Sequence, residues 1–190
     1  ILERDDHDLE LVAINDLAPA KANALLFKRD SVHGPFPGTV EADGNDIIVN
    51  GKRIHVTAER DPANLPHAAN GVDIALECTG FFTDRDKAVV HLENGASRVL
   101  VSAPSKGADK TIVYGVNHAK YAGEAIISNA SCTTNCFAPM VKVLDDAFGV
   151  DQGMITTIHA YTGDQRFLDF PHKDLRRARA GGGSNIDKQE

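Results

Sequence analysis

The strongest evidence for the fold class is the segment Val72-Asp73-Ile74-Ala75-Leu76-Glu77-Cys78. It is an apolar run of strand length, and a helical segment over 84–92, with Thr83 as its expected cap, separates it from a second strand over 98–102. Two buried strands joined through a helix form the unit from which parallel sheets are built. The sequence therefore predicts an α/β fold with a mostly parallel sheet and helices on both faces.

The rest of the chain continues this alternation of strands and helices. The remaining expected elements are a helix over 19–27 and strands over 9–14, 112–114 and 125–128. Three further short runs of strand character lie at 39–41, 47–49 and 53–56. Asn50-Gly51 between the last two is a strong hairpin signal, so these runs predict an antiparallel insertion.

Composition narrows the class of protein. The 190 residues carry a formal net charge of −7, which argues against nucleic acid or an anionic membrane as the main partner. No apolar run approaches the roughly 20 residues that span a bilayer, and the charged start resembles no signal peptide, so a cytoplasmic location is expected. Three cysteines predict no disulfide framework and no zinc site, and Cys78 and Cys136 are expected to be reduced and buried.

Cys132 is the leading candidate for a nucleophile. It follows an apolar strand in Ser131-Cys132-Thr133-Thr134-Asn135-Cys136, and it precedes a helical pattern that runs to Phe148. At the first turn of a helix, the unpaired N–H groups and the helix dipole stabilise a thiolate and lower the thiol pKa. The alternative is a cysteine that only packs as a small apolar side chain.

His159 supplies the second chemical signal. It lies in a run over 154–162 whose β-branched content and rough alternation predict a strand. An imidazole at the end of such a strand, facing the start of the Cys132 helix, could accept a proton from the thiol or from a substrate hydroxyl. The pair Cys132 and His159 therefore predicts covalent catalysis.

Several strings, in the same order along the chain, resemble the glyceraldehyde-3-phosphate dehydrogenase family of the phosphorylating, bacterial NAD type. They include Val12-Ala13-Ile14-Asn15-Asp16-Leu17, Glu77-Cys78-Thr79-Gly80-Phe81-Phe82, Ser102-Ala103-Pro104-Ser105, the Cys132 hexapeptide and His159-Ala160-Tyr161-Thr162-Gly163-Asp164-Gln165. The resemblance implies a chain truncated at both ends, without the first strand and the glycine-rich turn that holds the cofactor pyrophosphate. It implies a Rossmann-like NAD-binding domain over 1–131 and the start of an α+β catalytic domain over 132–190, which includes the family's S-loop.

Cofactor-binding residues are expected at the ends of strands, where open α/β sheets bind their ligands. Asp16 ends the first strand, and a carboxylate there would accept hydrogen bonds from ribose hydroxyls and repel a 2′-phosphate, which favours NAD over NADP. Thr79-Gly80 ends the next buried strand, and the glycine lets a cofactor approach the backbone. The resemblance adds Arg60 and Ser102 as NAD contacts, while Phe82 could be cofactor wall or core.

The resemblance also implies a reaction. Cys132 would attack the aldehyde of glyceraldehyde 3-phosphate, His159 would take the hydroxyl proton, and inorganic phosphate would release 1,3-bisphosphoglycerate from a thioester. Hydroxyl groups around the reacting carbon and the phosphates would come from Ser131, Thr133 and Thr162. The basic stretch at 176–179 could bind phosphate or contact another subunit, since the family is usually a homotetramer.

Of the other readings of the chain, one is set aside and the rest stay open. A cysteine phosphatase would need an arginine six residues after Cys132, where Ala138 stands. A cysteine hydrolase would share Cys132 and His159 but would not explain Asp16 and Thr79-Gly80 at successive strand ends. A catalytically silent, truncated nucleotide-binding fragment and an erythrose-4-phosphate dehydrogenase are the remaining alternatives.

Overall fold

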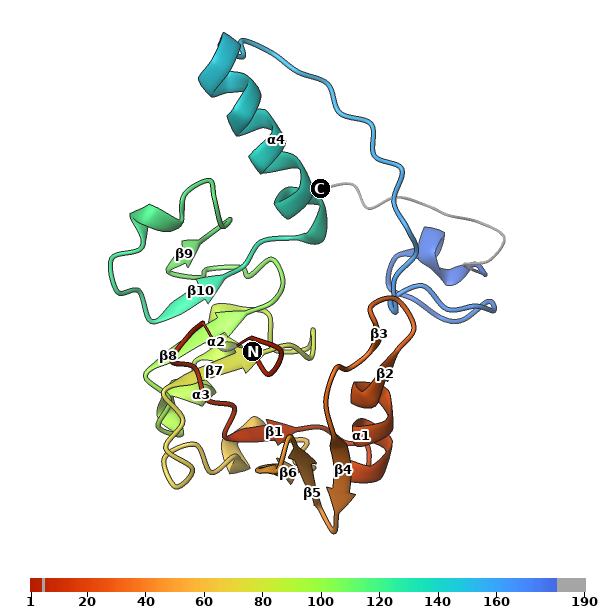
Figure 1. Cartoon of the computed structure of the whole chain (residues 1–190). Helices are drawn as coiled ribbons and strands as arrows, with labels where there is room; N and C mark the ends of the chain where they lie inside the picture. Colours follow the sequence, from red (N-terminus) through yellow and green to blue (C-terminus); the bar gives the residue numbers. More distant parts are fainter. Residues whose placement is uncertain (5, 181–190) are drawn as a thin grey trace. The chain divides into compact units, whose positions relative to one another are not determined.

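The computed structural model describes residues 1–4 and 6–180 of the chain (Figure 1). The chain divides into two compact units, Ile1–Pro139 and Met140–Glu190. Helix α4, Cys132–Phe148, begins in the first unit and ends in the second. The domain boundary expected after residue 131 stays a prediction.

A parallel sheet forms one half of the first unit, as the sequence predicts. Its strands are β7 Ile74–Glu77, β8 Arg98–Val101, β10 Ile126–Ser128 and β9 Lys110–Thr111, in that order across the sheet. All three pairings are parallel. Val99, Val101 and Ile126 are completely buried and pack with Ala88 of helix α2, Arg85–Ala88. Alternate residues of β8 thus form the centre of this core.

A second sheet holds the predicted antiparallel insertion. Its order is β1 Ala13–Asn15, β6 Lys52–Thr57, β5 Asp46–Val49 and β4 Val40–Asp43. Strand β1 runs parallel to β6, whereas β4, β5 and β6 pair antiparallel. Helix α1, Ala20–Lys28, contributes Ala20 and Ala24 to the core of this sheet. The small elements of the unit are β2 Arg29–Asp30, β3 Gly34–Pro35, η1 Pro62–Asn64 and η2 His118–Lys120.

The helix expected over 84–92 is two short helices, α2 and α3, Val90–Glu93, which meet at Val89. Two adjacent β-branched residues, Val89 and Val90, lower the helix propensity at this point. The N-cap position of α2 is Asp84, so the prediction of Thr83 as the cap is wrong.

Three expected strands also differ from the structure. Strand β1 starts only at Ala13. The strand expected over 112–114 is wrong: β9 ends at Thr111, and the side chain of Asn117 accepts the Val113 N–H (2.8 Å) and closes a turn after it. Strand β7 is not buried on both faces, since Ile74 and Leu76 are 49% and 50% exposed. Ala75 and Glu77, which point to the opposite face, are buried, so the strand is covered on one face and half open on the other.

The strand expected over 154–162 is wrong. None of these residues lies in a strand, and the side chains of Met154 and Ile158 are fully exposed. A strand requires a partner for its backbone hydrogen bonds, and the described part of the second unit contains only the end of α4 and η3, Leu175–Ala178, as regular elements. A strand-like composition therefore does not form a strand here.

The Asn50-Gly51 hairpin is confirmed and gives the first prediction. Both residues have a positive φ, 51° and 80°, between the paired residues Val49 and Lys52. Gly51→Ala should lower the free energy of unfolding by about 1–2 kcal/mol, because a β-carbon is disfavoured in the left-handed region. Urea denaturation measures the loss. Gly51→Asn is the control and should lose less, since asparagine enters this region more readily, and equal losses would contradict the explanation.

Candidate active site

The parallel sheet brings three of the predicted site segments together at the carboxyl-terminal ends of its strands. Glu77 of β7, Val101 of β8 and Ser128 of β10 lie level with one another in the ladder. Because the strands run parallel, the segments that follow them all leave from the same edge of the sheet. These segments are Thr79-Gly80, Ser102 and Ser131-Cys132. The sheet geometry therefore assembles a candidate site from residues about 50 positions apart in the sequence.

A network of local hydrogen bonds holds the segment that carries Cys132. The buried Ser131 accepts the Thr134 N–H at its Oγ (2.9 Å), which is the contact of a helix N-cap. The Asn135 side chain donates to the carbonyl oxygens of Asn129 (2.7 Å) and Ser131 (2.8 Å). Cys132 is the first residue of α4 and is exposed, so the expectation that it lies in the first turn is confirmed.

Ala130 gives this segment its sharp bend. It has a φ of 59°, a conformation that non-glycine residues seldom adopt. Its N–H donates to the Ser128 hydroxyl (3.1 Å), which in turn donates to the Ala103 carbonyl (2.8 Å). Buried contacts thus stabilise a strained residue two positions before Cys132.

The expectation that Cys78 and Cys136 are buried is wrong, since both are exposed. Cys136 lies one helical turn after Cys132, so it shares the exposed face of α4. Cys78 follows the last residue of β7, where the chain leaves the sheet.

Asp16 and Arg60, two predicted cofactor contacts, follow neighbouring strands of the other sheet and are both exposed. Asn15 connects their two segments. Its side-chain oxygen accepts the Thr57 hydroxyl (2.8 Å) and the Glu59 N–H (2.9 Å), and its amide donates to the Glu59 carbonyl (3.0 Å). Sequence reasoning did not single out Asn15.

The remaining predicted residues of the first unit have varied surroundings. Gly80 has a φ of 77°, and a β-carbon built on it would meet no atom within 4 Å. Ser102 is exposed, with its N–H bonded to the Glu77 carbonyl (3.0 Å), while Phe82 and Thr133 are half-buried. The open space beside Gly80 agrees with a backbone that a ligand can approach.

The second unit contains His159 and Thr162. Nδ1 of His159 donates to the Ala160 carbonyl, since a carbonyl can only accept, and this places the basic lone pair on Nε2. Thr162 is exposed, with its N–H donated to the Gln165 side chain (3.0 Å). Cys132 belongs to the first unit, so its pairing with His159 stays a prediction.

Two arginines of the predicted S-loop, Arg177 and Arg179, make ion pairs inside the second unit. Arg177 pairs with Asp164, and Arg179 with Asp169 (3.0 Å). Burial raises the pKa of Asp164, but His172 and Arg177 outweigh burial and lower the pKa below its ordinary value. The rest of the predicted loop, residues 181–186, lies outside the described residues.

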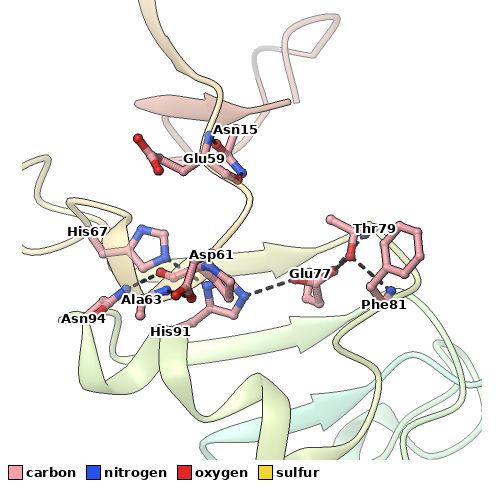
Figure 2. A network of polar contacts seen from close by, with 11 residues as sticks. Asn15, Glu59, Asp61, Ala63, His67, Glu77, Thr79, Phe81, His91 and Asn94 are labelled. Atoms are coloured by element: carbon pink, nitrogen blue, oxygen red, sulfur yellow. Dashed lines mark hydrogen bonds and ion pairs between the residues drawn. The ribbon is translucent and has the colours of Figure 1, made fainter. Parts of the chain in front are cut away.

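A buried polar chain that sequence reasoning missed lies beside Thr79 (Figure 2). The Glu77 carboxylate and the His91 imidazole, 4% and 5% exposed, are 3.0 Å apart, and His91 Nδ1 lies 3.0 Å from Nε2 of His67. Burial raises the pKa of Glu77, but hydrogen bonds from His91 and Thr79 lower it below the ordinary value. Burial, and then the neighbouring His91, lower the pKa of His67. The one sequence feature that could have indicated this buried polar chain is the glutamate, Glu77, inside an apolar strand.

The described residues contain neither a metal-binding cluster nor a membrane-spanning helix. No group of three or more histidine, cysteine, aspartate or glutamate side chains there is arranged to hold a metal ion. None of the helices described is both long enough and apolar enough to cross a membrane.

Comparison with known proteins agrees with the geometry. Residues 1–85 match the family model described as "Glyceraldehyde 3-phosphate dehydrogenase, NAD binding domain", and residues 131–187 match the C-terminal domain of the same family. The glyceraldehyde-3-phosphate dehydrogenases of Zymomonas mobilis and Xanthobacter flavus are 58% and 62% identical, each over 98% of this chain and 56% of the relative. That of Geobacillus stearothermophilus is 58% identical over 94% of this chain and 54% of the relative.

A parallel sheet with its predicted ligand-binding turns at one edge defines an α/β protein of the Rossmann-like, dinucleotide-binding class. The matches are more specific, and they cover both of the family's domains. The chain belongs to the glyceraldehyde 3-phosphate dehydrogenase family. It spans about half the length of the curated relatives that it matches.

The lowered pKa of His67 makes a prediction about stability and pH. Below its ordinary pKa of 6.5, His67 of the unfolded chain takes up a proton that folded His67 resists, so stability should fall as the pH drops below about 6.5. Urea unfolding at a series of pH values measures this slope. His67→Gln should flatten the slope, and an unchanged slope would assign it to another group.

The Asn135 contacts make a second prediction. Asn135→Ala should lower the free energy of unfolding by about 1–2 kcal/mol, because it leaves the Asn129 and Ser131 carbonyls without these donors. Lys142→Ala is the control on the same helix, since its exposed pair with Asp146 is worth less than about 0.5 kcal/mol. Losses of the same size in both variants would contradict the assignment.

Proposed function

We propose that this chain carries part of the active site of an NAD-dependent, phosphorylating glyceraldehyde-3-phosphate dehydrogenase. The observation that carries the proposal is the exposed Cys132 at the start of α4, behind a capped and strained turn. This environment favours a thiolate, the reactive form of cysteine. Membership of the family supports the choice of reaction and of NAD.

The residues present fit a dinucleotide. The space beside Gly80 would admit a cofactor, and the exposed Asp16 carboxylate ends β1, where it can accept hydrogen bonds from ribose hydroxyls. Arg60, Ser102 and Phe82 are the further proposed contacts. When bound, NAD would supply the acceptor for the hydride that the aldehyde carbon loses.

The chain's own residues would perform the covalent steps. The Cys132 thiolate attacks the aldehyde carbon and forms a thiohemiacetal, whose oxygen the Cys132 backbone N–H can stabilise. Nε2 of His159 accepts the hydroxyl proton as the thioester forms. Inorganic phosphate then attacks the thioester, and the S–C bond breaks to return the thiolate. Ser131, Thr133 and Thr162 are proposed to hold the substrate and the attacking phosphate.

A second candidate is a catalytically silent nucleotide-binding fragment. The observation that favours it is the edge of the parallel sheet at β7, where Ile74 and Leu76 are half exposed. An apolar edge strand of this kind promotes association with other chains in place of catalysis. Erythrose 4-phosphate is the alternative substrate for the dehydrogenase itself. A cytoplasmic location and a homo-oligomeric assembly stay predictions.

Turnover tests the proposal. The purified chain should reduce NAD in the presence of glyceraldehyde 3-phosphate and phosphate, followed as NADH absorbance, and Cys132→Ser should lose at least about 1,000-fold in rate because serine is a far weaker nucleophile here. Cys136→Ser, an exposed cysteine one turn away, is the control and should keep the wild-type rate. Equal rates in Cys132→Ser and wild type would exclude Cys132 as the nucleophile, whereas a folded wild-type chain without turnover would favour the silent fragment.

A further inference from the structure

The turn after β7 is bonded to the interior of the protein. Oε1 of Glu77 accepts both the N–H (2.8 Å) and the hydroxyl of Thr79, and the same hydroxyl accepts the Phe81 N–H (3.1 Å) (Figure 2). The second oxygen, Oε2, accepts from His91. A buried carboxylate needs such donors, because burial without hydrogen bonds strongly disfavours the charged group.

These contacts limit what Thr79 can offer to a ligand. A threonine hydroxyl has one proton, and the backbone N–H is the only other hydrogen-bond donor of the residue. Both of these donors point to Glu77. Thr79 is exposed, yet its polar hydrogens face inward, so its hydroxyl is poorly suited to donate to a bound cofactor.

Hydrogen bonds also hold the other predicted cofactor segment, which contains Arg60. His91 contacts His67, and Asn94, which follows α3, donates to the carbonyl of Pro62 in η1. Element η1 begins two residues after Arg60 and is capped by Asp61, whose side chain accepts the Ala63 N–H (3.0 Å). The segment after Arg60 is thus held by contacts of its own, while the Glu77–His91–His67 chain holds the Thr79-Gly80 turn.

We propose that Glu77 and His91 are positioning residues for the cofactor-binding turn, and that Thr79 acts by fixing this turn from inside and not by donating its hydroxyl to the cofactor. This inference rests on the proposed function, because it takes NAD as the ligand of the turn. In this role, Glu77 holds the backbone of residues 79–81, and His91 orients Glu77. The open side of Gly80 is thereby kept facing the ligand.

The test compares Thr79→Val, Thr79→Ser and His91→Gln in the full 190-residue chain. Two quantities are measured: amide hydrogen exchange at Phe81 by NMR, and the dissociation constant of NAD by titration. Thr79→Val should speed exchange at Phe81 about tenfold and raise the NAD dissociation constant about tenfold, because it removes both hydroxyl bonds and frees the turn. Thr79→Ser keeps the hydroxyl and should match the wild type in both measurements.

Exchange at Val99, whose N–H bonds to the Ala125 carbonyl (2.8 Å), reports on the sheet and should not change in Thr79→Val. His91→Gln touches no residue of the turn directly, and it should still weaken NAD binding. Weaker binding in Thr79→Val with unchanged exchange at Phe81, or wild-type binding in His91→Gln, would overturn the proposal. So would an unchanged NAD dissociation constant in Thr79→Val.

Failure of the proposed function would look different. If the wild-type chain binds no NAD, the assignment of the cofactor fails for this chain. Exchange at Phe81 then decides by itself whether Glu77 holds the turn: faster exchange in Thr79→Val supports the holding role, and unchanged exchange overturns it.

Discussion

The in-register parallel pairing of β7, β8 and β10 is the constraint on which the candidate site depends. Because Glu77, Val101 and Ser128 lie level, three separate loops start at one edge, and the proposed nucleophile and cofactor turn come from different strands of one ladder. The pairing is maintained by completely buried Val99, Val101 and Ile126, which need no polar partner. A shift of one residue in β8 would turn Val99 and Val101 to the other face of the sheet and bring their neighbours inward. By fixing the register of the strands, the apolar core determines which loops come together at the candidate site.

Charged groups contribute to this structure very unequally. The surface pairs, such as Arg53 with Asp43, are more than half exposed and are each worth little in water. The Glu77 carboxylate is buried at the end of a strand and accepts hydrogen bonds from His91 and Thr79, so the loss of a donor would leave part of a buried carboxylate without a partner. The amino-acid composition does not distinguish charges at the surface from the buried charge of Glu77. The structure distinguishes them by burial, and the buried Glu77 has the larger structural role.

Prediction from sequence succeeded where the signal was local. Helix α4, the Asn50-Gly51 hairpin and the parallel strands were foreseen, because apolar periodicity and turn chemistry act over a few residues. It failed where a partner decides the outcome: the run over 154–162 has a strand's composition, but the structure gives it no partner in its described surroundings. The polar chain was also missed, since His67, Glu77 and His91 are far apart in sequence and meet only in the fold.

The same distinction divides the two residues of the proposed chemistry. Ser131 and Asn135, on either side of Cys132, make hydrogen bonds with residues of the same segment, and Ser128 donates to the Ala103 carbonyl at the adjacent strand end. His159 lies in an extended run where the structure forms no ladder, and its described hydrogen bond is to the neighbouring carbonyl. A locally built nucleophile can persist when distant parts of a chain change, whereas a base that must be brought to it depends on tertiary contacts. The start of α4 that carries Cys132 is therefore built largely from one stretch of chain, whereas the proposed proton transfer also requires His159 to be brought to the thiol.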